Sequence, residues 1–315
     1  MLRYISIRIF HMVPVLFGVI LAVFTITHIV PGDPVLLMLD NQYTQKEYDE
    51  MKAYLELDKP LPMQFWNYLK GIMKGDLGKT IHSREPVTEV IFRRFPATFI
   101  LSIAALIIAA GISIPIGIIS ALKQNTKIDY ISMVMAQFGI SVPIFWLGIV
   151  LLLFLSLHLD LLPVGGRGDP PDIKHLILPA FCLAIPFMAM TARLTRSCML
   201  EVLRENYIIA ARSRGFSETR VILKHVLKNA MIPVVTNLGL QLSRMLGGAL
   251  IIEVVFRWPG MGGLAYDAIM ERDYPIVMGV VLLVAIIFII INLLVDLSYT
   301  LFDPRISYDT KLSED

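Results

Sequence analysis

Long apolar runs alternate with short polar connections along most of this 315-residue chain. The first run carries no charged residue between Ile9 and Val30, which is enough length to cross a hydrocarbon core of about 30 Å. Five further runs follow, and four contain proline, which membrane helices tolerate where neighbouring helices satisfy the freed backbone groups. The five expected spans are about residues 98–122, 131–158, 175–191, 231–256 and 276–302. The pattern predicts an all-α polytopic membrane protein with six transmembrane helices.

A polar stretch, residues 31–97, separates the first two apolar runs. Thr44 and Glu47 have the spacing of a capping box, in which each side chain satisfies a free amide at the start of a helix. We expect that helix to continue through about Leu55, and a second, amphipathic helix over Met63–Met73 near the membrane surface. The stretch is therefore predicted to be an extracytoplasmic insert between spans 1 and 2.

Two other interpretations of this end of the chain do not fit its sequence. A secretory signal has an apolar region of about 7–15 residues and then a small-residue cleavage site, whereas the run here is longer and ends at Pro31. Residues 78–80 read G-K-T, as in a phosphate-binding loop, but Met73 stands where that loop needs its first glycine. Residues 1–30 are expected to hold the N-terminus and an uncleaved first span, and no ATP site is expected.

The stretch between residues 204 and 233 is polar and lies between two apolar runs. Four residues recur at helical spacing and are expected to share one helical face: Leu203, Tyr207, Ala210 and Ala211. Gly215 is suited to ending that helix, because glycine accepts a left-handed backbone, and Ser217 can cap a second helix. The apolar side of the second helix is expected to be Val221, Ile222, Val226 and Leu227. Two short helices joined at a glycine are predicted to project from the membrane.

Three motifs stand out in the second half of the chain: Y-I-I-A-A-R-S-R-G-F-S from Tyr207, N-A-M-I-P-V-V-T from Asn229, and W-P-G-M-G-G from Trp258. The insert adds L-D-K-P-L-P, Q-F-W-N-Y-L and G-D-L-G. Together they resemble the peptide (dipeptide/oligopeptide) permease family of ATP-binding-cassette (ABC) transporters. The chain departs from the Glu-Ala-Ala loop motif of ABC transporter permeases at two positions. Ile209 stands where that motif has glutamate, and Lys228 stands where many permeases have proline. Members of the peptide branch commonly differ from the motif at both positions. The alternative is a basic loop that only helps to set membrane topology.

The resemblance covers Met1 to about Ser307 and implies the type I ABC importer permease fold, as the first-permease (B-type) subunit. In that family a cytoplasmic loop, here residues 200–230, docks into an ATPase subunit and couples ATP hydrolysis to transport. The resemblance assigns that role to Tyr207, Ala210, Ala211, Arg212, Arg214, Gly215, Phe216 and Ser217. It implies a peptide substrate, with nickel complexes, glutathione or oligosaccharides as alternatives.

The same resemblance implies the partners of the chain. They are a second homologous permease subunit, two ABC ATPase subunits, an extracytoplasmic solute-binding protein and membrane lipids. No catalytic residue and no cofactor are expected in this chain, because the ATPase subunits would bind ATP and magnesium. The chain is therefore expected to be a non-catalytic subunit of an importer.

Composition and charge agree with a membrane protein. The chain is 56% hydrophobic with a mean hydropathy of +0.68, and its 17% of charged residues is below the ~25% usual for soluble domains. Lys and Arg concentrate in short segments of one side, so the positive-inside rule places both termini and the 200–230 loop in the cytoplasm. We expect a permease core over residues 98–307 and a cytoplasmic tail over 308–315, in a bacterial cytoplasmic (inner) membrane.

Arg244 lies in the middle of the fifth apolar run, where an ionised side chain normally faces a cavity or a partner charge. One hypothesis is that it lines the pathway and attracts an anionic part of the substrate, such as a peptide carboxylate. The alternative is an arginine paired with the second permease or snorkelling toward lipid headgroups. The other pathway or gate candidates are Asn237, Gln241, Glu253, Arg257 and Trp258. Contacts between helices and an aromatic anchor with a tight turn are the alternatives for these.

Other classes of protein fit the sequence less well. Six histidines and two cysteines lack metal-ligand spacing, and Cys182 and Cys198 are too far apart along one helix for a disulfide, so neither a metal site nor a disulfide is expected. The basic cluster lacks an aromatic stacking platform, so lipid and protein are better partners for it than nucleic acid. A channel or ion-coupled secondary transporter is the alternative of another class. It would need acids in the middle of a span, whereas Glu253, Asp273 and Asp296 lie toward span ends.

Overall fold

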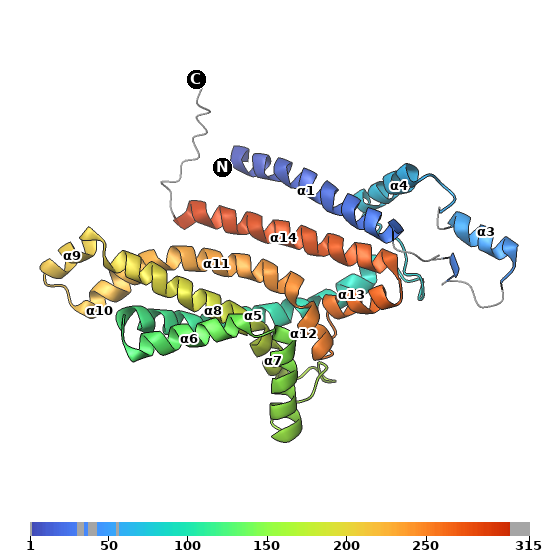
Figure 1. Ribbon diagram of the computed structural model, residues 1–315. Coiled ribbons are helices and arrows are strands. Elements are labelled where there is room, and N and C mark those ends of the chain that lie inside the picture. The colour runs from blue at the N-terminus through green and yellow to red at the C-terminus, as the bar shows by residue number, and fades with distance from the viewer. Residues whose placement is uncertain (1, 30–34, 37–42, 55–56, 303–315) are drawn as a thin grey trace. The chain divides into compact units, whose positions relative to one another are not determined.

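The computed structural model describes residues 2–29, 35–36, 43–54 and 57–302, and over these residues the fold is helical (Figure 1). The elements are α1 (Leu2–Ile29), α3 (Gln45–Tyr54), α4 (Leu61–Met73), α5 (Val87–Leu122), α6 (Lys127–Ser141), α7 (Ile144–Leu151), the π-helix η1 (Leu152–His158), α8 (Ile173–Leu203), α9 (Asn206–Ser213), α10 (Glu218–Arg220), the π-helix η2 (Val221–Val226), α11 (Leu227–Gly248), α12 (Leu250–Val255), α13 (Met261–Met270) and α14 (Tyr274–Phe302). The chain divides into two compact units, residues 1–99 with 257–289 and residues 100–256 with 290–315.

In the first unit, α1 is held by contacts with α4 and α14. Phe24 packs edge-on against Phe65 of α4, with ring centroids 5.2 Å apart. Thr27 Oγ1 donates to the sulfur of Met278 in α14 at 3.7 Å. Gly279 of α14 lets α5 come close, because a Cβ at that glycine would stand 2.7 Å from a methyl of Val87. These contacts explain why an apolar helix near the N-terminus packs beside the segment 31–97.

The two helices expected in that segment are present in the described residues. The Thr44 amide donates to Glu47 Oε2 at 2.7 Å and the Glu47 amide donates to Thr44 Oγ1 at 3.3 Å, so the capping box is confirmed. The Thr44 amide also lowers the pKa of the Glu47 carboxyl. The predicted amphipathic helix over 63–73 is confirmed as α4.

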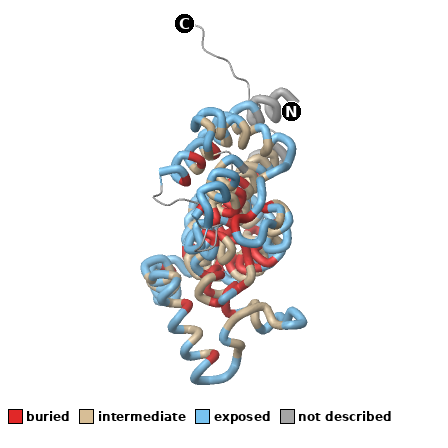
Figure 2. The backbone as a smooth tube through the Cα atoms, turned by 90° about the vertical axis from the view of Figure 1, so that its right-hand side faces the viewer, coloured by how far each residue is buried: buried red, intermediate tan, exposed pale blue. Residues whose placement is uncertain are grey.

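The second unit is built around α8, which contacts α6, α7, α11 and α12. Figure 1 shows α6, α8 and α11 side by side. Small residues permit this approach: a Cβ on Gly139 of α6 would stand 3.3 Å from that of Ala189, and one on Gly117 of α5 would stand 2.6 Å from that of Thr195. Figure 2 shows buried and exposed residues alternating along the helices, as expected when one face of each is packed.

Four helices of the described residues are long and apolar enough to cross a membrane, or five if the bent pair of α6 with α7–η1 is one span. The four lie in α1, α5, α8 and α14. The expected fifth span is divided between α11 and α12, which are not among them, because polar residues such as Asn237, Gln241 and Arg244 lower the hydropathy of α11. The described helices establish a polytopic helical membrane protein.

One helix bound differs from expectation and one predicted break is confirmed. α5 begins at Val87, eleven residues before the expected start at Thr98, and continues through Pro96. α8 is 31 residues long and continues beyond the apolar span through the expected basic extension, Arg193 and Arg196, to Leu203. Proline removes one backbone hydrogen bond, but neighbouring helices can support the helix on both sides of it. The predicted break at Pro143 is confirmed, and the two helices that flank it meet at 101°.

Candidate coupling site

The segment of residues 204–220, here called the coupling segment, rests on the second unit through helix α9. Ile208 and Ala211 are the buried residues of α9. They join a hydrophobic cluster with Ala121, Cys198, Met199, Val221, Val226 and Ala230. Because these residues come from α5, α8, η2 and α11, the base of α9 is fixed on four other elements.

The coupling segment also carries exposed apolar side chains. Tyr207, Ile209 and Phe216 are 44%, 53% and 37% exposed. All three lie among arginines and glutamates, so they are not part of an apolar helix surface that lipid would cover. A fixed base with exposed apolar side chains is the arrangement expected of a docking surface for another protein.

The prediction that Leu203, Tyr207, Ala210 and Ala211 share one helical face is wrong. α8 ends at Leu203 and α9 begins at Asn206, so the break changes the helical phase between them. Within α9, Ala211 is buried while Tyr207 and Ala210 are exposed. The alanines therefore have different roles, one in packing and one on the surface.

The turn that follows α9 is closed by its own side chains. Gly215 has a φ of +77°, which confirms the predicted left-handed position after the helix. Arg212 donates to both carboxylate oxygens of Glu218, at 3.1 and 2.7 Å. The Arg220 guanidinium lies over the Phe216 ring, 4.8 Å from its centroid. Contacts across the turn thus limit the conformations it can adopt.

The sequence predicts a separate short helix after Gly215, but the helix that follows this glycine is not separate. α10, η2 and α11 follow one another without a break, so the segment leads directly into the long helix α11. Ser217 occupies the N-cap position of α10, but its side chain makes no capping hydrogen bond. The predicted apolar side is confirmed: Val221 and Val226 are buried, and Ile222 and Leu227 pack against the same cluster.

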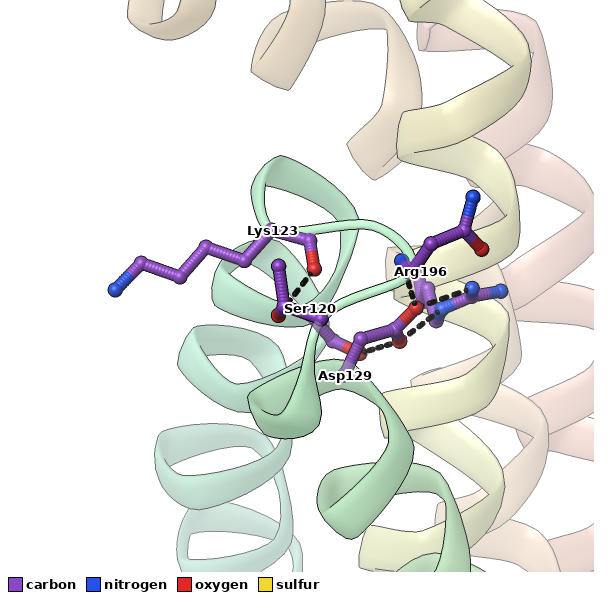
Figure 3. A network of polar contacts seen from close by, with 6 residues as sticks. Ser120, Lys123, Asp129 and Arg196 are labelled. Atoms are coloured by element: carbon purple, nitrogen blue, oxygen red, sulfur yellow. Dashed lines mark hydrogen bonds and ion pairs between the residues drawn. The ribbon is translucent and has the colours of Figure 1, made fainter.

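A polar network that the sequence does not reveal joins α5, α6 and α8 (Figure 3). Asp129, in the first turn of α6, accepts from Ser120 Oγ of α5 at 2.5 Å and from the Asn125 amide at 3.0 Å. Arg196 of α8 donates to the two oxygens of the same carboxylate, at 2.6 Å from Nε and 2.7 Å from Nη2. In the sequence, Asp129 stands out only as one acid among the basic residues of the α5–α6 turn. Its partner Arg196 lies 67 positions further along the chain, so the sequence alone does not indicate the pair.

Arg196 also borders a surface hollow at the corner between α8 and α9. The hollow has a volume of about 590 Å³. It is lined by Arg196, Ser197, Leu200, Glu201, Arg204, Glu205 and Asn206. Its lining mixes both signs of charge, so it has no evident preference for an anion or a cation.

The pathway candidates on α11 have different surroundings. Gln241 is buried and exchanges hydrogen bonds with Thr191 of α8, at 3.1 and 2.9 Å, so it joins two helices. The buried Nδ2 of Asn237 has no hydrogen-bond partner among the described residues. Arg244 is exposed and makes no ion pair or hydrogen bond within the described residues.

The candidates at the C-terminal end of the fifth run differ in burial. Glu253 of α12 is fully buried, and Arg257 is exposed with a φ of +49°. Trp258 is 3% exposed and its indole N–H donates to the carbonyl of Ala97 at 2.9 Å. Trp258 thus packs inside the first unit of the chain.

Comparison with known families accounts for nearly all of the chain. Residues 113–308 match the family described as "Binding-protein-dependent transport system inner membrane component". Residues 1–102 match the corresponding N-terminal family, "Binding-prot-dependent transport system membrane comp, N-term". The chain belongs to this family of binding-protein-dependent transport system inner membrane components.

Curated relatives of this transport component match over almost their whole length. Dipeptide transport system permease protein DppB of Escherichia coli (strain K12) is 41% identical over 337 residues, covering 98% of this chain and 99% of the relative. Glutathione transport system permease protein GsiC of Pectobacterium atrosepticum is 42% identical over 308 residues, covering 98% and 100%. Oligopeptide transport system permease protein AppB of Bacillus subtilis is 39% identical over 316 residues, covering 98% and 100%. The chain is thus a membrane component of a transport system and not an enzyme.

A solved structure agrees at the level of the fold. A chain of the MetNI methionine ABC transporter, in inward-facing conformations, aligns with a TM-score of 0.59 at 17% identity and covers 70% of this chain and 99% of that one.

Among the residues that the structure describes, no group of three or more histidine, cysteine, aspartate or glutamate side chains is placed to hold a metal ion. Cys182 and Cys198 are free and buried.

Proposed function

We propose that this chain is the permease subunit of an ATP-driven importer and that it forms the translocation path for dipeptides and oligopeptides. The observation that carries the proposal is the coupling segment, which presents exposed Tyr207, Ile209 and Phe216 on a base fixed by Ile208 and Ala211. A cytoplasmic ATPase subunit is the partner that an importer requires at such a surface. The names of relatives about 40% identical support peptides as the substrate class.

The proposed topology has six spans, with α11 and α12 together forming the fifth and the bent α6–α7 pair the third. Residues 31–97 form an extracytoplasmic insert, and both termini are cytoplasmic. The excess of Lys and Arg in one set of connections supports this orientation. It places the coupling segment in the cytoplasm of a bacterial cell, where ATP is available.

The partners in this proposal are a second homologous permease subunit, two ABC ATPase subunits and an extracytoplasmic solute-binding protein, within the lipids of the inner membrane. No residue of this chain carries out covalent chemistry, and ATP and magnesium are bound by the ATPase subunits. Movement of the ATPase subunits on hydrolysis displaces the coupling segment. The spans then alternate between outward and inward access.

Arg244 is proposed to face the pathway, where it attracts a carboxylate of the substrate. It is exposed on this chain at a depth where lipid would disfavour an ionised side chain. Asn237, Gln241, Glu253, Arg257 and Trp258 remain proposed pathway or gate residues, and the burial of Gln241, Glu253 and Trp258 favours a supporting role for these three.

Glutathione is the second candidate substrate, because a glutathione permease is 42% identical over nearly the whole chain. Nickel complexes and oligosaccharides are further alternatives within the same family. An ATPase-independent channel or secondary transporter is the alternative of another class. It does not account for a braced surface with outward apolar side chains at the cytoplasmic end.

The proposal is tested by ATP-dependent uptake in vesicles that contain the chain with its partner permease, ATPase subunits and binding protein. A labelled dipeptide is offered together with unlabelled competitors: the same dipeptide, its C-terminal amide, or glutathione. We expect uptake that requires ATP, strong competition by the free dipeptide and weak competition by the amide. Arg244→Ala should reduce the difference in competition between the free dipeptide and its C-terminal amide, whereas Arg244→Lys should keep part of that difference. Uptake without ATP would contradict the importer, and an unchanged preference in Arg244→Ala would contradict the role of Arg244.

A further inference from the structure

A partly buried ion pair ties the first turn of α6 to α8. Arg196 lies about two turns before Leu203, where α8 ends and the coupling segment begins. The side chains of Arg196 and Asp129 are only 24% and 6% exposed. The guanidinium meets both carboxylate oxygens, and a bidentate pair fixes orientation as well as distance. The pair therefore fixes the position of the last turns of α8 relative to the first turn of α6.

The Asp129 carboxylate is itself held from two further directions. Ser120 comes from the last turn of α5 and the Asn125 amide from the α5–α6 turn, so the four donors approach from three elements (Figure 3). Asn125 has a φ of +63°, a left-handed conformation that asparagine adopts more readily than most residues. With all four donors in place, the carboxylate has little freedom to rotate away from Arg196.

This pair is not needed to hold the two helices together. α6 and α8 pack along their length, and Gly139 of α6 comes close to Ala189 of α8. Arg193 of α8 also donates to Gln137 of α6 at 3.1 Å in an exposed contact. A buried ion pair pays a desolvation penalty that can equal its Coulomb gain, so it adds little net stability over apolar packing. Its distinct contribution is a fixed geometry.

Helix α6 leads from the ion pair to a sharp bend in the second unit. α6 ends at Ser141, and beyond Pro143 the chain continues at 101° to it. α7 packs on α8 and α12, and a Cβ on Gly148 of α7 would stand 3.2 Å from the Phe256 ring. A displacement of the cytoplasmic end of α8 would reach this bend through Asp129 and α6.

We propose that Asp129 and Arg196 are positioning residues that carry the movement of the coupling segment to the bent α6–α7 pair. This inference rests on the proposed function, because it takes the coupling segment as the place where the ATPase acts. It concerns the transmission step inside this chain, and not the docking surface itself. Loss of the pair should leave docking intact and separate ATP hydrolysis from transport.

The experiment uses the complete complex in vesicles and measures peptide uptake and ATP hydrolysis on the same preparation. Asp129→Asn removes the charge with almost no change of shape, and Arg196→Lys keeps the charge but loses the bidentate contact. Gln137→Ala is the matched control, since it removes the exposed contact between the same two helices. The amount of ATPase that co-purifies with each variant gives the amount of assembled complex.

We expect Asp129→Asn to lower the uptake per ATP hydrolysed by about tenfold, which is within the usual range of coupling between sites. Arg196→Lys should show a smaller loss in the same ratio, and Gln137→Ala should match the wild type. A merely structural role would lower the quantity of complex but leave the ratio unchanged. Ratios equal to that of the wild type in the two network variants would overturn the inference.

Three further outcomes complete the test, and the first separates this inference from the function on which it rests. If the wild-type complex shows no ATP-dependent uptake, the proposed function itself fails. If the complex with Asp129→Asn does not assemble, the uptake per ATP hydrolysed by Arg196→Lys tests the positioning role instead. If neither network variant assembles while Gln137→Ala does, the pair serves assembly, and the positioning role is overturned.

Discussion

Two connections between helices, residues 204–220 and residues 257–273, have the same length and similar numbers of charged residues but are attached to the protein in opposite ways. Side chains tie the second connection to the backbone of its own unit. Trp258 donates to Ala97, Thr98 Oγ1 accepts from the Met261 amide at 2.8 Å, and Asp273 accepts from the Ile81 amide at 2.9 Å.

The polar contacts of the first connection are largely internal. Arg212 pairs with Glu218, and Arg220 lies over Phe216. Tyr207 accepts a hydrogen bond from Asn229, at the start of the helix into which the segment leads. Residues 257–273 are thus held by polar contacts with the rest of their unit, whereas residues 204–220 are held by the apolar packing of α9 and by contacts within their own turn. Substitutions at three positions test this contrast.

The largest effect is expected at Trp258. Replacement of a buried tryptophan by alanine removes its packing and leaves a cavity, so Trp258→Ala should lower the free energy of unfolding by about 3–5 kcal/mol. Chemical denaturation in detergent solution measures this. Trp258→Phe keeps most of the ring but leaves the Ala97 carbonyl without its donor, so a loss of about 1–3 kcal/mol is expected. A negligible change in Trp258→Ala would show that the connection is not held by this residue.

A smaller effect is expected at Asp273, which is buried just before α14. Asp273→Ala leaves the buried amide of Ile81 without an acceptor and should cost about 1–3 kcal/mol of unfolding free energy. Asp273→Asn keeps an oxygen at this place and should cost less. Equal losses in the two variants would contradict the role of that hydrogen bond.

Asp273 also predicts a dependence on pH. Burial raises the pKa of its carboxyl above the ordinary value of 3.8, although hydrogen bonds from the amides of Ile81 and Ile276 offset part of the shift. A raised pKa in the folded state means that the carboxyl contributes stability below about pH 3.8 and that this contribution is lost as pH rises through the folded pKa. The wild type should therefore lose stability relative to Asp273→Asn over this range. A difference that does not vary with pH would contradict the shift.

The smallest effect is expected at the ion pair within the coupling segment. The side chains of Arg212 and Glu218 are 41% and 59% exposed. Exposed pairs contribute about 0–1 kcal/mol, so Glu218→Ala should change the free energy of unfolding by less than about 1 kcal/mol. A larger loss in the same denaturation experiment would mean that this turn is as firmly attached as residues 257–273.

Local signals predicted much of this fold. The capping box at Thr44, the helix end at Gly215 and the break at Pro143 each depend on one or two neighbouring residues, and all three are present. Apolar runs located the principal helices. The start of α5 was missed because Arg93, Arg94 and Pro96 resemble a helix boundary, although the helix continues through them.

Long-range contacts explain what the sequence did not reveal. In the sequence, Asp129 is an acid at the start of a helix and Arg196 is one of several basic residues after the fourth apolar run. Only the fold brings these two residues, 67 positions apart, into contact. Trp258 was assigned to a boundary or gate, but its burial depends on Ala97, which is 161 positions away. The phase of α9 depends on where α8 ends, and an uninterrupted pattern of apolar residues does not show that break.

The central claim is that the coupling segment docks on an ATPase subunit, and matched isoleucines test it directly. Ile209 in the coupling segment and Ile269 in α13 are 53% and 56% exposed. Each is replaced by lysine in a tagged chain, and the ATPase that co-purifies from native membranes is measured. Neither exposed change should alter unfolding free energy by more than about 0.5 kcal/mol. The account predicts that Ile209→Lys loses most of the ATPase while Ile269→Lys retains it. Equal recovery with the two variants, or no ATPase with the wild type, would contradict it.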